Sequence, residues 1–487
     1  MRDDEFRENL EQTVPLVLSY GTDSLQIPPE AKPEEISRYA NPQEFIRKCH
    51  EGFKLAQGRL LSILLSIEDE MRIADKKIVE SQRDSQKALK KQLETESAKL
   101  QFQRASFKEV ANVIAWTLFR MERTHIKAMM KVGMWDGYLR DRNIRSVINQ
   151  ADEINSDPDS FALITDMTSC LGMGDLIVVK NGRTAIVEVK EGKVNERIGK
   201  MLKEPPTMDD EDLSTLRKLS PTKVLDQTAR FARQIATAKN AIQYVRTDYT
   251  EEYHMTGLPK FAIDPLHPPV HLRKPVEEIV SKIQVGQWRF LHADVLIVGI
   301  LKPDPAYVSF VSRLDFQHYL YHEKGVPWEK CRYTNRVDDQ FARPEFMEYE
   351  NTPIYSMRRK VFSPTRIPIF AMLGPRNGID VLTDVLRIYV YFDVDSFYEL
   401  CQSVGLQPTW MSEKEYRRSL GKQLSRMSSP PLFSRGYLSF GKGDNRRVFM
   451  HGMLGSLVYE LETGFSVARK LKVEPPTITR WRSRRGG

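Results

Sequence analysis

Residues 171–193 read LGMGDLIVVKNGRTAIVEVKEGK, with two short apolar runs on either side of an Asn-Gly pair. An Asn-Gly pair between two β-forming runs predicts a hairpin, because both central residues of a type I′ turn need positive φ. Counting outward from this turn gives the register of the two strands. It places Leu176 opposite Val187 and Asp175 directly opposite Glu188.

The far end of this predicted hairpin carries charged residues on one face. Lys190 lies two residues beyond Glu188, so the two side chains share a face of the strand. Like charges that oppose each other in a sheet are destabilising, so we expect a divalent cation between Asp175 and Glu188. The strands are otherwise apolar on both faces, which predicts a buried sheet covered by helices. Charges in such surroundings are costly unless they are paired or bound to metal.

The order Gly-Asp, twelve residues, then Glu-Val-Lys resembles the PD-(D/E)XK nuclease superfamily. The resemblance implies a restriction-endonuclease-like α/β fold, with a central mixed sheet flanked by helices, and metal-dependent phosphodiester hydrolysis. It implies that Asp175 and Glu188 bind the metal and that Lys190 assists the attacking water or the scissile phosphate. The family's proline is absent, and Met173 and Gly174 stand in its place. The alternative is an ordinary hairpin with surface charges.

The same resemblance implies that the helices before and after the hairpin carry further functional residues. The apolar pattern of residues 106–130 predicts a buried helix before the hairpin, where the superfamily often carries another acidic metal ligand. Glu122 is the first candidate for this ligand and Glu109 is the second. On the helix predicted after the hairpin, Gln227 and Arg230 are candidates to face the substrate. The alternative for all four is an ordinary helix-surface role.

The N-terminal region is predicted to be mostly helical. Residues 59–132 contain neither Gly nor Pro, which predicts one long helix or a helical hairpin. An antiparallel hairpin within the chain and an intermolecular coil both remain open, and we expect a homo-oligomer formed through this region. Lys87, Lys90 and Lys91 could grip DNA or form a solvated face. Residues 1–40 are expected to be an arm or a small cap.

The chain of 487 residues is too long for a single core. We expect a helical N-terminal region at 1–104, a nuclease-like core at 105–325, and a mixed α/β accessory domain of unknown role at 326–487. The apolar run 290–301 is expected to be one further strand of the core sheet.

Two other acidic sites in the sequence are given structural interpretations. Asp294 precedes an apolar run as Asp175 does, but no Glu-x-Lys at the end of a second apolar strand follows it, so we assign no second site. Asp393 and Asp395 form an Asp-x-Asp pair, and we expect Asp395 with Ser396 to cap the next helix.

Composition limits the class of protein. The formal net charge of +8 permits an anionic partner such as nucleic acid. The four cysteines form no CxxC motif, which argues against a zinc finger or a disulfide framework and fits a reducing cytoplasm. The chain opens without a signal-like apolar stretch, and its apolar runs are too short to span a bilayer, so we expect no membrane partner.

These observations together predict a nuclease that depends on Mg²⁺ or Mn²⁺, with DNA as the expected substrate. Ligation by oxygen atoms alone favours these hard cations over zinc. RNA cleavage is one alternative, and a catalytically degenerate nuclease fold acting as a nucleic-acid-binding or oligomeric scaffold is another. The sequence has no P-loop, so any dependence on a nucleoside triphosphate would require a partner protein. By analogy of layout alone, such chains occur in bacterial restriction and anti-phage systems.

Overall fold

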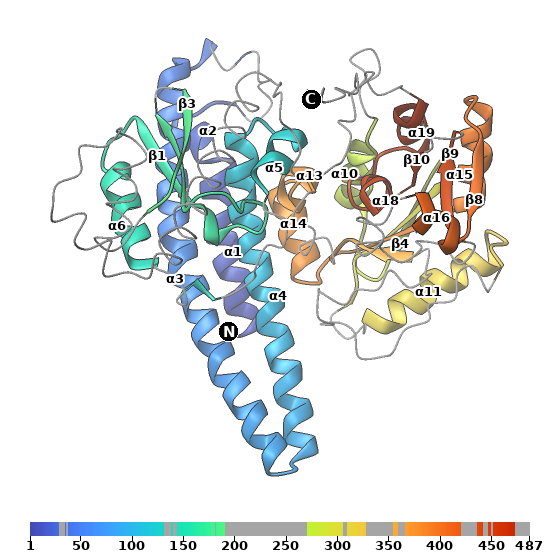
Figure 1. The fold of residues 1–487 in the computed structure, drawn as a ribbon, viewed down its shortest axis with the longest axis horizontal. Helices are drawn as coiled ribbons and strands as arrows, with labels where there is room; N and C mark the ends of the chain where they lie inside the picture. Colours follow the sequence, from blue (N-terminus) through green and yellow to red (C-terminus); the bar gives the residue numbers. More distant parts are fainter. Residues whose placement is uncertain are drawn as a thin grey trace, which may run out of the picture. The chain divides into compact units, whose positions relative to one another are not determined.

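The computed structural model describes residues 1–28, 35, 38–130, 138–139, 144–180, 182–189, 270–304, 309–327, 354–358, 366–419, 436–441, 447–449 and 451–472. The chain forms two compact units, Met1–Gly257 and Leu258–Gly487. Helices and small antiparallel sheets occur in both units (Figure 1). The expected mixed α/β class and the helical N-terminal region are therefore confirmed. In the part of the chain that the structure describes, no helix is long and apolar enough to cross a membrane.

In the first unit, helices come first along the chain and are followed by a three-stranded sheet of order β1-β2-β3. Its elements are α1 (Asp3–Leu18), α2 (Tyr20–Ser24), α3 (Pro42–Arg83), α4 (Lys87–Leu118), α5 (Arg123–Met129), α6 (Ile144–Asn155), β1 (Ser160–Ile164), the 3₁₀ turn η3 (Thr165–Met167), β2 (Leu176–Lys180) and β3 (Arg183–Val187).

Helices α3 and α4 form an antiparallel hairpin within the chain, which is one of the arrangements that the absence of Gly and Pro left open. They contain 42 and 32 residues and are joined by three residues, 84–86. Within the hairpin, Arg104 Nε donates to Glu68 Oε1 at 2.9 Å, and both side chains are buried. Leu139 N donates to the other carboxylate oxygen of Glu68 at 2.6 Å. This buried ion pair joins the two helices. Each helix therefore has its antiparallel partner within the same chain.

The structure decides between alternatives for the N-terminal half and changes one boundary. Residues 1–28 are a cap and not an arm, because α1 buries Phe6, Leu10 and Val14 at helical spacing against the hairpin. The Phe6 and Phe107 rings meet edge to face with centroids 5.5 Å apart. Helix α4 also runs without a break through the boundary expected at residues 104 and 105. The helical region and the hairpin stretch therefore belong to one unit.

The free edge of strand β1 is closed by side-chain amides. Gln57 of α3 donates from Nε2 to Ala162 O at 3.0 Å, and its Oε1 accepts from Ile164 N at 3.0 Å. Asn155 of α6 accepts from Ala162 N at 2.8 Å. Gln57 and Asn155 together satisfy Ala162 O, Ile164 N and Ala162 N, so these groups of the buried strand β1 need no fourth strand.

The second unit contains a four-stranded antiparallel sheet of order β4-β5-β7-β6 and a smaller sheet of order β10-β9-β8. Its elements are α10 (Arg273–Lys282), β4 (Trp288–Ala293), β5 (Leu296–Leu301), α11 (Ser309–His322), β6 (Ile354–Ser356), α13 (Ile369–Leu373), α14 (Pro375–Leu382), β7 (Arg387–Phe392), α15 (Val394–Ser403), β8 (Pro408–Met411), α16 (Glu413–Ser419), β9 (Tyr437–Phe440), β10 (Arg447–Val448), α18 (His451–Tyr459) and α19 (Gly464–Lys472).

The run 290–301 is not one strand of the nuclease-like sheet. It is divided between β4 and β5, which form a hairpin in the second unit with Ala293 paired to Leu296. Asp294 adopts φ 47° in the two-residue turn and so breaks the run. Its carboxylate accepts a hydrogen bond from Phe465 N at 3.2 Å, at the start of α19. Asp294 therefore has a structural role that its sequence context did not reveal.

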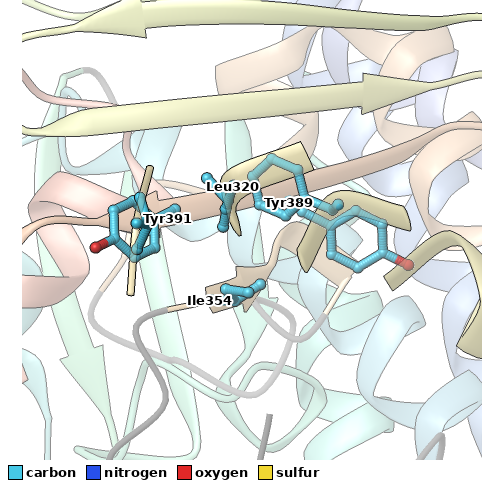
Figure 2. Close-up of a cluster of buried hydrophobic side chains, with 6 residues drawn as sticks. Leu320, Ile354, Tyr389 and Tyr391 are labelled. Atoms are coloured by element: carbon cyan, nitrogen blue, oxygen red, sulfur yellow. The ribbon is translucent and has the colours of Figure 1, made fainter. Parts of the chain in front are cut away.

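One face of the four-stranded sheet packs on α11. Tyr389 and Tyr391 lie two residues apart on β7, so they share a face of the sheet. They form a buried cluster with Leu320 of α11 and Ile354 of β6 (Figure 2). This cluster accounts for the two tyrosines of β7, and Ile388, Val390 and Phe392 on the other face are buried as well.

The Asp-x-Asp pair after β7 is a helix cap, although the capping residue is Asp393 and not Asp395. Asp393 Oδ1 accepts from the backbone amides of Asp395 and Ser396, at 3.1 and 3.3 Å. Asp393 Oδ2 accepts from the Ser396 hydroxyl at 2.8 Å. The carboxylate satisfies amides at the start of α15 that have no partner within the helix.

Replacing Gln57 tests the closure of the β1 edge. In Gln57→Ala, Ile164 N loses its acceptor inside the protein, and we expect the free energy of unfolding to fall by about 2 kcal/mol. Gln82→Ala is the matched control, because Gln82 lies exposed on the same helix. Urea unfolding measures both values, and equal stability of the two variants would contradict the assigned role of Gln57.

Candidate functional site

The hairpin of strands β2 and β3 has the register that the sequence predicted. Five residue pairs form the ladder, from Lys180 opposite Arg183 at the turn to Leu176 opposite Val187 at the far end. Gly182 has φ 70°, as a primed turn requires. Asn181 lies outside the described residues. Asp175 and Glu188 are the next residues along the two strands, so the register brings them to the same end of the hairpin.

The sixth predicted pair, Asp175 with Glu188, is not part of the ladder. Asp175 N donates to Val187 O at 2.9 Å, one residue out of the register of the other pairs. Asp175 and Leu176 thus both face Val187, which is the arrangement of a β-bulge. The Asp175 side chain reaches across the hairpin, where its Oδ2 accepts from Val189 N at 2.7 Å. The Asp175 carboxylate is therefore held beside the backbone that follows Glu188.

The backbone just before Asp175 is also fixed. Thr165 binds the carbonyl groups of Gly174 and Asp175. Its hydroxyl donates to Gly174 O at 2.6 Å, and its amide donates to Asp175 O at 3.1 Å. Gly174 has φ 71°, and a Cβ atom there would lie 2.3 Å from Ile186 Cγ2. Glycine is therefore required where the family's proline would stand, which explains the Met-Gly departure in physical terms.

Helix α4 anchors the loop that leads to Asp175 through a buried amide. Asn112 Oδ1 accepts from Ser169 N at 2.9 Å, and Asn112 Nδ2 donates to the Ser169 hydroxyl at 2.7 Å. The same amide donates to Glu109 Oε2 at 3.0 Å. Burial raises the pKa of the adjacent Cys170 thiol, and the negative charge of Glu109 raises it further.

Asn112 is a residue that the sequence reasoning missed. It is fully buried within an apolar stretch of α4, between Ala111 and Val113. A carboxamide in such a stretch must find partners, because an unsatisfied buried amide is costly. A single polar residue within an apolar helical stretch is therefore the sequence pattern that could have identified Asn112.

The remaining predicted residues are not brought to the hairpin in the described part of the chain. Glu122 lies exposed immediately before α5, after Arg120 and Met121, which both have positive φ. Lys190 and the pair Gln227 and Arg230 lie outside the described residues. Across the ranges that the structure describes, no group of three or more His, Cys, Asp and Glu side chains could hold a metal ion.

The expected burial of both faces of the hairpin is only partly correct. All five residues of β1 are buried, as are Leu176 and Ile177 at the start of β2. The residues of β3 are exposed or half-buried, whereas β1, at the other edge of the sheet, packs against α3 and α6. Asp175 and Glu188 are half-buried. The two carboxylates thus lie where the buried side of the sheet meets solvent.

The donor chemistry of this pair fits a hard divalent cation. Both side chains offer carboxylate oxygens, which are preferred ligands of Mg²⁺ and Mn²⁺. Comparisons with protein-family models, with curated proteins and with solved structures find no match to this chain. The interpretation of the site therefore depends on its residues and their geometry.

Two glycines of the hairpin form a matched test of this geometry. Gly174 and Gly182 have φ values of 71° and 70°, but a Cβ atom at Gly182 would meet nothing within 4 Å. We expect Gly182→Ala to cost about 1 kcal/mol, which is the penalty for the left-handed conformation alone. Gly174→Ala also forces Ile186 to move and should cost about 2 kcal/mol more. Urea unfolding of the two variants measures the difference, and equal costs would contradict the close contact.

Proposed function

We propose that this protein is a metal-dependent nuclease that hydrolyses phosphodiester bonds in DNA, with a restriction-endonuclease-like core built around β1, β2 and β3. The observation that carries the proposal is the register of β2 and β3, which ends at Leu176 opposite Val187 and so leaves Asp175 and Glu188 as the next residues of the two strands at one end of the hairpin. Lys190 follows two residues later in the sequence, in the order that the nuclease resemblance requires.

In this proposal Asp175 and Glu188 hold Mg²⁺ or Mn²⁺. When bound, such an ion offsets the negative charge of the phosphate and lowers the pKa of the attacking water. Lys190 contributes a positive charge that orients the water or stabilises the charge that develops on the phosphate.

The protein keeps one of these carboxylates in a fixed orientation. Val189 N donates to Asp175 Oδ2, and Thr165 binds the carbonyls of Gly174 and Asp175. The bonds from Asn112 to Ser169 hold the preceding loop on α4. Rigid support of this kind is what a metal-binding carboxylate needs, because ligand orientation affects both affinity and rate.

Conservative substitutions at the three residues test the proposed activity. Asp175→Asn can keep the hydrogen bond from Val189 N while losing the charge, so the fold should be retained. We expect Asp175→Asn, Glu188→Gln and Lys190→Met each to lower DNA cleavage by at least about 100-fold. The assay uses linear, supercoiled and single-stranded DNA, and RNA, each with Mg²⁺, Mn²⁺ or EDTA.

Asp159→Asn is the matched control, because Asp159 lies exposed in the same unit just before β1. Thermal melting checks that every variant remains folded. Cleavage that persists in EDTA, or in all three site variants, would refute the proposal. Cleavage of RNA alone would support the alternative substrate. Nucleic-acid binding without cleavage under any condition would instead support the scaffold interpretation.

A further inference from the structure

The far end of the α3–α4 hairpin concentrates positive charge. Residues 76–91, called here the hairpin tip, contain six Lys or Arg and two Asp or Glu, a net charge of +4. The whole chain has a net charge of only +8. The rest of the hairpin is close to neutral, with a net charge of −1 over residues 42–75 and of 0 over residues 92–118. The tip is therefore a local concentration of positive charge, which suits an anionic partner.

Four of the tip cations are exposed and make no ion pair among the residues that the structure describes. These are Lys76, Lys77, Arg83 and Lys87. Lys90 differs, because its Nζ lies 3.7 Å from Glu94 Oε1 in a helical i,i+4 pair. Unpaired cations are the ones that can replace the counterions condensed on nucleic-acid phosphates, and this replacement drives electrostatic binding.

The hairpin carries these charges away from the sheet. Gln57 of α3 contacts β1, and Arg83 lies 26 residues further along the same helix. At 1.5 Å per residue, the tip is about 39 Å from that contact. Figure 1 shows the end of the α3–α4 hairpin extending beyond the other labelled elements of its unit. A duplex rises about 3.4 Å per base pair, so about 12 base pairs cover this distance.

We propose that the hairpin tip binds the phosphate backbone of duplex DNA at a distance from the candidate catalytic residues, an inference that rests on the proposed nuclease function. Duplex DNA fits this role because it is stiff over such lengths and carries one charge per about 1.7 Å of its axis. Lysine and arginine contacts of this kind carry no base information, so the tip adds affinity and not sequence specificity.

The test measures DNA binding in EDTA, which separates it from cleavage. Affinity of the full chain for a 30-base-pair duplex, about 100 Å long, is followed by fluorescence anisotropy over a range of NaCl concentrations. Each phosphate contact contributes about 0.9 to the slope of log K against log salt. Lys77→Gln/Lys87→Gln should therefore reduce this slope by about 1.8, and Lys77→Arg/Lys87→Arg should leave it unchanged.

Lys274→Gln/Lys282→Gln is the matched control, because it removes two exposed lysines from α10. An unchanged slope in the tip variant, an equal fall in the control, or no duplex binding by the wild-type chain would overturn the proposal. Cleavage by the same preparations in Mg²⁺ or Mn²⁺ is scored separately against Asp175→Asn. A reduced slope without any metal-dependent cleavage would support the tip and refute the nuclease, whereas cleavage with an unchanged slope would refute only the tip.

Discussion

The first unit depends on how the free edge of β1 is satisfied. A three-stranded sheet leaves backbone groups unpaired along both outer strands, and β1 is buried where water cannot supply the missing bonds. Gln57 provides one donor and one acceptor to this edge, and Asn155 provides a further acceptor. Because Gln57 belongs to α3, the same two hydrogen bonds attach the long helical hairpin to the sheet. The candidate site lies on β2 and β3, the strands that follow β1 in the sheet, so it is built on the same attachment.

The parts of this structure that sequence could predict are those governed by local rules. The Asn-Gly turn was sufficient for five strand pairs, because the geometry of a two-residue turn fixes the register of its strands. The absence of Gly and Pro was sufficient to predict long helices, although it left a single helix and a hairpin both open. Both predictions needed only neighbours in sequence or a single tight turn.

The predictions that the structure corrected concern features that depend on contacts between residues far apart in the sequence. The offset at Asp175 arises where Thr165 binds the carbonyls of Gly174 and Asp175. The geometry of the Asn-Gly turn does not predict these contacts. In the turn that divides residues 290–301, Asp294 accepts from Phe465, which lies 171 residues later. Similarly, the difference in exposure between β3 and β1 depends on which edge of the sheet the helices cover, and an apolar run alone does not specify this. Lys190, Gln227 and Arg230 remain predictions.

Departures from local rules gather around Asp175 in a way that favours a functional interpretation. A left-handed glycine in close contact with Ile186, a bulge, and a buried Asn112 in an apolar helix all act on the short segment that carries one carboxylate. Each departs from what a plain hairpin on an apolar helix would show, and proteins tend to keep such departures at functional sites. Asp294 offers a contrast within the same chain, because it also precedes an apolar strand at a positive-φ turn. Its carboxylate accepts from a backbone amide at the start of α19, whereas the Asp175 carboxylate accepts from Val189 N at the end of the β2–β3 hairpin.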